Sequence, residues 1–219
     1  VGVYGIQGIP SLSNVPDVRY ECGSWTDTSG NFWIGGGEFG TVHWNDLWKY
    51  DFDLGMWTWV HGPDVPNQPG SKGIVDIADP TNIPEPYAVP FTWSDKQNNL
   101  WLLGGLGTYT TFWKYHIASN QWTLKKELTG SVYGMKGVPS KQNYPPGRFE
   151  TRTHWTDTNG VLWMFGGMAG GEMANDLWRF NPVTEEWTWM AGDPVLGNGQ
   201  IGYEATYGSK RVPSPSNKP

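Results

Sequence analysis

The side chains of this sequence that could take part in catalysis are few and widely separated. Its four histidines are His43, His61, His116 and His154, and no two of them have the spacing of a metal-binding motif. Cys22 has no second cysteine with which to form a disulfide or a metal cluster. No Ser/His/Asp arrangement can be recognised from the sequence. We therefore predict no catalytic residue, no metal site and no cofactor.

Two glutamates are the remaining candidates for acid–base chemistry. Glu38 and Glu172 occupy corresponding loops, and a glycosidase needs two carboxyl groups that converge. The same loops offer polar and aromatic side chains for ligand contact, and variable loops on a rigid scaffold are the usual place of binding. The loop candidates for a binding surface are Glu38, His43, Trp44, Tyr109, Glu172 and Met173.

Trp44 has two interpretations. It could be an exposed aromatic anchor for a partner protein or a stacking platform for a sugar. It could equally pack beneath the neighbouring long loop and serve the fold alone. The sequence leaves both interpretations open.

The scaffold that positions these loops is predicted by an internal repeat, in which the same blocks occur three times. Each copy has a Trp-Thr-Asp or Trp-Ser-Asp block, a Trp followed by a Gly-Gly pair, a Trp-Lys-Tyr-like block and a final Trp-Thr block. We expect the tryptophans in this register to form the core. They are Trp25, Trp33, Trp48, Trp57, Trp59, Trp93, Trp101, Trp113, Trp122, Trp155, Trp163, Trp178, Trp187 and Trp189.

Each copy is expected to form four short strands. In the third copy the predicted strands are 149–156, 161–166, 176–181 and 186–190. The abundance of Gly, Pro and aromatic residues disfavours helices and favours strands joined by turns. The dipeptide Asn159-Gly160 is a strong hairpin signal, because both residues tolerate a positive φ.

The repeat predicts one continuous array over residues 1–219 rather than two independent domains. The predicted segments are a first unit at 16–60, a connection at 61–86, a second unit at 87–124, a connection at 125–146, a third unit at 147–190, and a lead-in to a next repeat at 191–219. The connections contain a weaker repeat of their own, in which a glycine precedes an Asn-x-Pro motif. Its copies include Asn14-x-Pro16, Asn82-x-Pro84 and Asn143-x-Pro145.

Charge and hydropathy exclude two classes of partner. The formal net charge is −6 and the sequence has no run of Lys or Arg, which argues against nucleic acid or an anionic membrane surface. No apolar run approaches the about 20 residues that a membrane-spanning helix needs. We therefore expect no nucleic-acid binding and no membrane insertion.

The combination of motifs resembles the kelch repeat of β-propellers. In the third copy the matching residues are Arg148, Gly166-Gly167, Asn175-Asp176-Leu177-Trp178-Arg179-Phe180 and Trp187-Thr188-Trp189. The resemblance implies an all-β fold of kelch-type β-propeller blades, here three four-stranded antiparallel sheets.

The sequence also departs from the kelch pattern. The middle copy has Thr111-Phe112 in place of Asp-Leu and has no counterpart of Arg148 or Arg19. The intervals from Trp33 to Trp101 and from Trp101 to Trp163 exceed the usual period of about 50 residues. Three blades are fewer than the about 4–8 of a typical closed propeller. We therefore expect an incomplete ring or part of a larger array.

The resemblance implies a non-enzymatic interaction or structural module that binds partner proteins or assembles with further copies of itself. It looks like a segment of a secreted or cell-surface repeat protein, although a cytoplasmic place stays open. One alternative is a carbohydrate-binding propeller. Another is a galactose oxidase-like copper enzyme, which needs His and Tyr ligands near the axis and a Cys to modify one Tyr. Cys22 has no identifiable Tyr partner.

Overall fold

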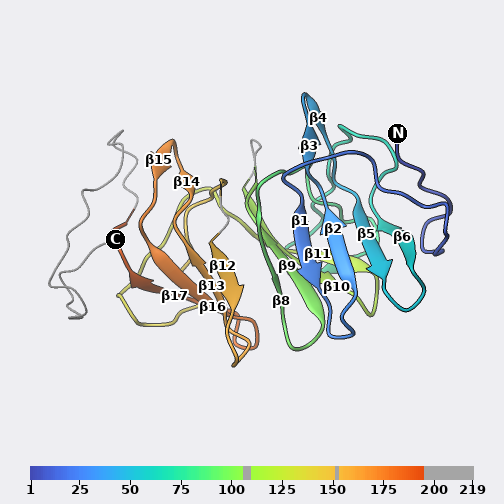
Figure 1. Ribbon diagram of the computed structural model, residues 1–219. Helices are drawn as coiled ribbons and strands as arrows, with labels where there is room; N and C mark the ends of the chain where they lie inside the picture. Colours follow the sequence, from blue (N-terminus) through green and yellow to red (C-terminus); the bar gives the residue numbers. More distant parts are fainter. Residues whose placement is uncertain (106–109, 151–152, 195–219) are drawn as a thin grey trace, which may run out of the picture.

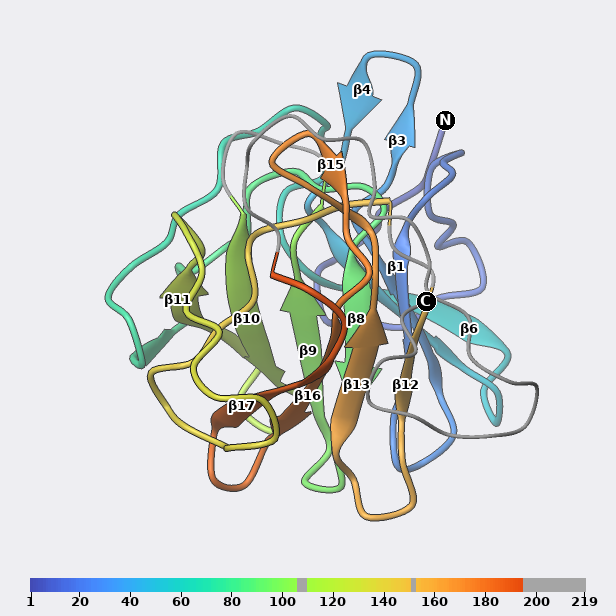
Figure 2. The ribbon, with the colours of Figure 1, turned by 90° about the vertical axis from the view of Figure 1, so that its left-hand side faces the viewer.

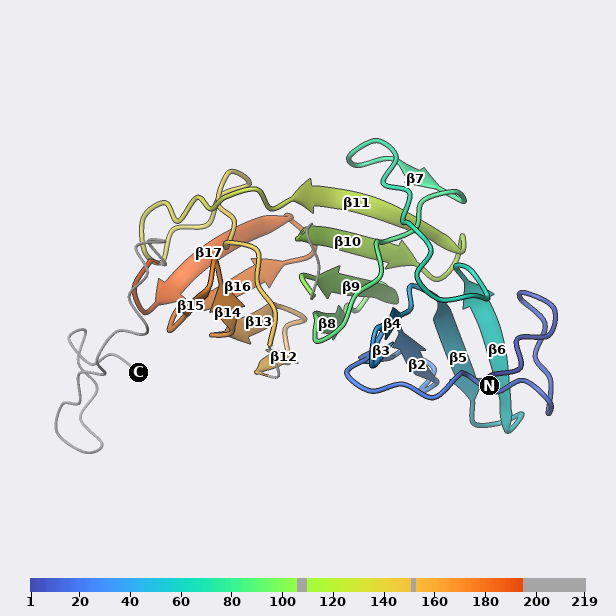
Figure 3. The same cartoon turned by 90° about the horizontal axis from the view of Figure 1, so that it is seen from above.

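The computed structural model describes residues 1–105, 110–150 and 153–194, and over these residues the chain forms strands and turns but no helix. Three antiparallel sheets stand side by side along an arc, which Figure 3 shows from above. The prediction of an all-β chain is therefore confirmed. The first strands of the three sheets are neighbours on the inner side of the arc, where β8 contacts both β1 and β12.

Each sheet is a meander of consecutive strands (Figure 1). The first sheet has the order β1 (Gly23–Thr26), β2 (Phe32–Gly35), β5 (Leu47–Asp51) and β6 (Met56–His61). The middle sheet has the order β8 (Phe91–Ser94), β9 (Asn99–Leu103), β10 (Thr111–His116), β11 (Gln121–Glu127) and β7 (Ala78–Asp79). The third sheet has the order β12 (His154–Thr156), β13 (Leu162–Phe165), β16 (Leu177–Asn181) and β17 (Glu186–Ala191).

Two details of the strand prediction need correction. The middle sheet has a fifth strand, because β7, which lies in the predicted connection 61–86, pairs with the outer edge of β11. The first strand of the third unit is shorter than the predicted 149–156, since β12 begins at His154. Glu150 has φ 58°, which is incompatible with an extended strand.

The recurrent tryptophan spacing has a simple structural reason. Trp25 and Trp33 face each other across the first hairpin of their sheet, as do the pairs Trp93–Trp101 and Trp155–Trp163. An aspartate in each intervening turn binds backbone N–H groups of the turn through one oxygen. The other oxygen accepts the indole N–H of the second tryptophan, at 2.8 Å for Asp27–Trp33 and Asp95–Trp101 and 2.9 Å for Asp157–Trp163. The hydrogen bond from Trp163 lowers the pKa of Asp157.

The core consists of two layers of aromatic and aliphatic side chains, one between each pair of neighbouring sheets. Between the middle and third sheets, the rings of Phe112 and Phe180 meet edge to face with centroids 5.0 Å apart. Between the first and middle sheets, Trp33 packs on Tyr115 at 5.9 Å. Most tryptophans in register are buried as predicted, but Trp155 is exposed, because it lies on the face of the third sheet that points away from the middle sheet.

The outer edge of every sheet is covered by a segment that precedes that sheet in the chain. We call residues 3–15, 71–83 and 132–144 the covering segments, and each is closed by a bridge between its two ends. They donate backbone hydrogen bonds to the fourth strand of their own sheet, from Ser11 to Trp57, from Asp76 to Leu124 and from Ser140 to Trp187. An open strand edge is a site of unwanted pairing, and the covering segments remove it.

The Asn-x-Pro motif of the connections holds these segments in place. Buried Asn82 donates its side-chain N–H groups to the carbonyls of Trp122 at 2.9 Å and of Ile77 at 3.0 Å. Asn14 and Asn143 make the equivalent bonds in the other sheets. Gly73 has φ 62°, and a Cβ there would lie 2.1 Å from Asn82 Oδ1, which explains the glycine that precedes each motif.

Replacement of this buried amide should weaken the middle sheet. We expect Asn82→Ala to lower the free energy of unfolding by about 1–3 kcal/mol, because the buried carbonyl of Trp122 and the partly buried carbonyl of Ile77 lose a donor. Unfolding in urea followed by tryptophan fluorescence measures the change. Thr81→Ala, at an exposed neighbour, is the control, and equal effects of the two variants would contradict the assigned role of Asn82.

Candidate binding sites

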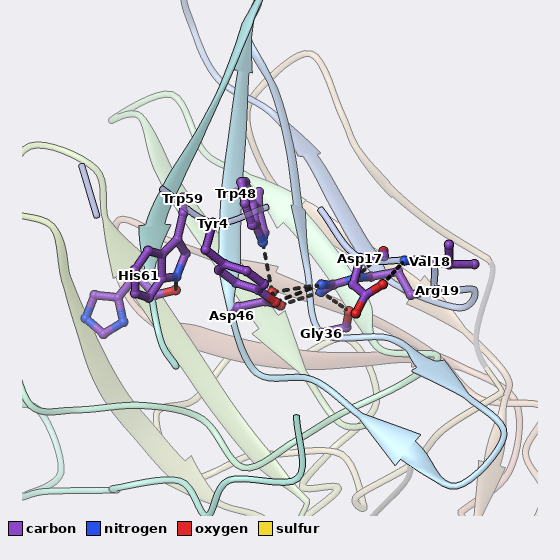
Figure 4. A network of polar contacts seen from close by, with 9 residues as sticks. All are labelled: Tyr4, Asp17, Val18, Arg19, Gly36, Asp46, Trp48, Trp59 and His61. Carbon is purple, nitrogen blue, oxygen red and sulfur yellow. Dashed lines mark hydrogen bonds and ion pairs between the residues drawn. The ribbon is translucent and has the colours of Figure 1, made fainter. Parts of the chain in front are cut away.

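A buried polar cluster joins the first covering segment to the first sheet (Figure 4). Arg19 forms a two-pronged ion pair with Asp46, with Nη2 2.8 Å from Oδ2. The same carboxylate accepts hydrogen bonds from the hydroxyl of Tyr4 at 2.6 Å and the indole of Trp48 at 2.8 Å. Arg19 also donates to the carbonyl of Gly36 at 3.0 Å. The first sheet is thereby locked to the segments that flank it.

The third sheet repeats this cluster atom for atom. Arg148 pairs with Asp176 at 2.8 Å between Nη2 and Oδ2, and Asp176 accepts bonds from Tyr133 at 2.7 Å and Trp178 at 2.8 Å. Both charged groups are buried. Burial alone would raise the pKa of Asp176, but the guanidinium of Arg148 holds this pKa below its ordinary value.

The middle sheet has lost both members of the pair. Thr111 replaces the aspartate and accepts the indole N–H of Trp113 at 2.8 Å, while Tyr87 occupies the position of the arginine. A lone buried charge is far more costly than a neutral pair, so joint replacement is the stable alternative. The ring of Tyr87 contacts Gly36, where a Cβ would lie 2.5 Å from it. The Gly-Gly pair therefore allows a large ring to approach.

The loop candidates lie on the side of the arc where the hairpins β3 (Glu38–Phe39)–β4 (Val42–His43) and β14 (Met168–Ala169)–β15 (Glu172–Met173) project (Figure 1). Glu38 and His43 are cross-strand neighbours, with Oε2 and Nε2 2.9 Å apart. Met173 is exposed and Glu172 is buried. Both lie in the hairpin β14–β15, whereas Glu38 lies in the hairpin β3–β4. Tyr109 lies outside the described residues.

The structure decides between the two interpretations of Trp44. Its side chain is only 3 % exposed, and the guanidinium of Arg19 lies 4.6 Å from its ring centroid. The side chain of Trp44 is therefore packed within the fold and is not an exposed anchor. Phe39, which the sequence did not single out, is the exposed ring of the same hairpin. Only its place in a variable loop could have indicated it.

The histidines do not converge. His61 is buried against Tyr115, His116 bonds Thr123 at 2.9 Å, and His43 pairs with Glu38. His154 and Cys22 share a pocket of about 370 Å³ on the inner side of the arc. Burial lowers the pKa of His154 and raises that of the Cys22 thiol, which favours the uncharged form of each group. Among the described residues, no three His, Cys, Asp or Glu side chains are placed to hold a metal ion.

The two ends of the arc expose surfaces that are buried elsewhere in the molecule. Figure 2 views the outer face of the third sheet, where Trp155 is 44 % exposed, compared with 4 % for Trp25 and 3 % for Trp93 at the equivalent positions. On the outer face of the first sheet Phe32 is 37 % exposed, whereas Leu100 and Leu162 at the equivalent positions are 0 % exposed. The outer faces therefore differ from the interior joints in the exposure of these equivalent side chains.

No family model and no curated protein matches the chain. The part that the structure describes contains no helix of the length and hydropathy that crossing a membrane requires.

The buried ion pair of the third sheet should be essential to its stability. Arg148→Ala leaves the Asp176 carboxylate buried without its partner, and we expect a loss of about 3–5 kcal/mol in the free energy of unfolding, measured in urea. Arg179→Ala, on a partly exposed position of the same sheet, should change little. The double variant Arg148→Tyr/Asp176→Thr copies the middle sheet and should recover part of the loss. An effect of Arg148→Ala as small as that of Arg179→Ala would contradict this assignment.

Buried His61 should make stability depend on pH. Burial lowers the pKa of His61 in the folded chain, whereas the unfolded chain takes up the proton near pH 6.5. The unfolded state therefore binds more protons, and the contribution of His61 to the free energy of unfolding should be constant above about pH 7 and fall as the pH drops through about 6.5. Urea unfolding at several pH values should show a smaller fall in His61→Gln than in the wild-type chain. Identical pH profiles of the wild-type chain and His61→Gln would show that His61 does not contribute to the pH dependence of stability.

Proposed function

We propose that the chain is a non-enzymatic interaction module built of kelch-type β-propeller blades, which binds protein partners or further copies of itself. Three meander sheets with neighbouring first strands support the blade assignment. The resemblance of the sequence to kelch repeats supports a secreted or cell-surface repeat protein as its setting.

The observation on which this function rests is the exposure of the two end faces. Trp155 and Phe32 are large apolar side chains in positions that are buried in the interior of the array. Apolar surface of this kind, flanked by polar residues, is typical of protein–protein contact. A second contact area is provided by the projecting hairpins, through exposed Phe39 and Met173.

The polar residues of the chain are used mainly to hold its sheets together. Arg19 and Arg148 bind buried carboxylates, and the turn aspartates bind indoles. This chemistry supports a scaffold rather than a catalyst. We accordingly propose neither an oxidase centre nor a glycosidase pair for this chain.

One observation favours sugar binding as a second candidate. The rings of Trp155 and Trp163 stack with an interplanar angle of 4° and centroids 5.7 Å apart, and the outer ring is exposed. A flat exposed indole is a good surface for the apolar face of a sugar. The carbohydrate-binding alternative would therefore use the outer face of the third sheet.

Light scattering after size exclusion tests association of the chain. We expect an apparent mass that rises with concentration above the 24.5 kDa of one chain, because burial of the exposed aromatic faces is favourable. A glycan array tests the alternative. Glycan binding that is lost in Trp155→Ala, together with a monomeric mass at all concentrations, would favour the sugar-binding function over assembly. Stoichiometric copper after copper loading would contradict the non-enzymatic assignment.

A further inference from the structure

The joint between neighbouring sheets has a fixed hydrogen bond that occurs twice in the chain. Trp25 of the first sheet donates its indole N–H to the backbone carbonyl of Trp101 in the middle sheet at 2.9 Å. Trp93 of the middle sheet donates in the same way to the carbonyl of Trp163 in the third sheet, also at 2.9 Å. Each joint therefore has a donor half, on the sheet nearer the N-terminus, and an acceptor half, on the next sheet.

One donor half and one acceptor half remain unmatched at the ends of the arc. Trp155 occupies the position of Trp25 and Trp93, and over the described residues its indole N–H donates no hydrogen bond. The carbonyl of Trp33 occupies the position of the acceptor carbonyls of Trp101 and Trp163. We propose that these two halves join between two copies of the chain, with Trp155 of one copy donating to the Trp33 carbonyl of the other. This inference rests on the proposed function and specifies the partner.

The side chains of the acceptor half have the same character in all three sheets. The interior joints bury Leu100, Tyr115 and Trp122 of the middle sheet, and Leu162, Phe180 and Trp187 of the third sheet. The first sheet has Phe32, Tyr50 and Trp57 at these positions, and all three are partly or largely exposed. The end face of the first sheet is thus suited to the same contact.

The donor half of the third sheet and the end face of the first sheet both lack the charged residues of one interior ion pair. In the joint between the middle and third sheets, Lys125 forms an ion pair with Glu185 at 2.9 Å. At the end faces Met190 takes the position of Lys125, and Gly55 takes the position of Glu185. Both charges are lost together, so the joint between copies would bury no unpaired charge from this pair.

The first covering segment leaves the acceptor half accessible. Tyr4 packs on Trp48 with ring centroids 4.8 Å apart, and Tyr133 packs on Trp178 in the same way at 4.9 Å. In the third sheet this packing coexists with an intact joint to the middle sheet. The covering segment of the first sheet is therefore compatible with a sheet docked beside it.

A second copy is the occupant that satisfies both ends at once. Because the two halves differ, copies associate head to tail, and such contacts form a ring if the rotation closes and a filament if it does not. The three meander sheets of the described residues would become six in a pair of copies, which is within the about 4–8 of closed propellers.

Complementary variants test this joint. Trp155→Ala removes the donor half and Phe32→Asp the acceptor half, both at partly exposed positions, so that circular dichroism should confirm a folded chain. We expect each variant alone to remain at 24.5 kDa in light scattering under conditions in which the wild-type chain associates. An equimolar mixture should form a one-to-one pair, because each variant retains the half that the other lacks. Trp155→Phe, which keeps a ring but has no N–H, should weaken association about 5-fold to 10-fold.

The control is Phe39→Ala, which changes the projecting hairpin and leaves both end faces intact, and it should associate like the wild-type chain. Unchanged association of both end-face variants, or a mixture that stays monomeric, would overturn the joint. If only Phe39→Ala lost association, the joint between the end faces would also be overturned. Copies would then associate through the loop side, which would still support the proposed function. A wild-type chain that is monomeric at every concentration would overturn the joint and leave partner binding as the remaining form of the proposed function.

Discussion

The requirement that a buried indole N–H find an acceptor organises this structure. Transfer of such a group into an apolar interior without a hydrogen bond is costly. Most tryptophans on the first three strands of each meander have an acceptor, and Trp155 at the end of the array is the exception. Indoles of second strands bond turn aspartates, and indoles of third strands bond Asp46, Thr111 or Asp176. The first-strand indoles of Trp25 and Trp93 bond the neighbouring sheet. The last kind of bond converts three similar sheets into one array.

The middle sheet shows how far this scheme tolerates change. Its third-strand indole keeps an acceptor although the acceptor is now a hydroxyl, and the arginine that would have needed the lost carboxylate is replaced by Tyr87. The hydrogen bond of the indole is retained while the ion pair is not. An acceptor for the indole N–H is therefore the stricter of the two requirements. The ion pair is found in the first and third sheets alone among the three meander sheets of the described residues.

Much of the fold follows from the sequence, since the pairs Trp25–Trp33 and Trp93–Trp101 have a spacing that only a short hairpin brings face to face. The sequence left the burial of Trp44 undecided, because its ring packs against Arg19, a residue of a distant segment. The exposure of Trp155 could not be predicted, because its local sequence matches that of Trp25 and only its place at the end of the array differs. β7 was missed because the segment 71–83 has no alternating pattern and becomes a strand by contact with β11.

The covering segments have a consequence for how such a chain can lengthen. Each one is made before the sheet whose last strand it protects, so a segment and its sheet form a self-contained block of sequence. Duplication of one block inserts a sheet that already has its outer edge sealed, and neither neighbour has to change its own pairing. An array of this kind can vary in its number of units by gene duplication without ever passing through a form that exposes a bare strand edge.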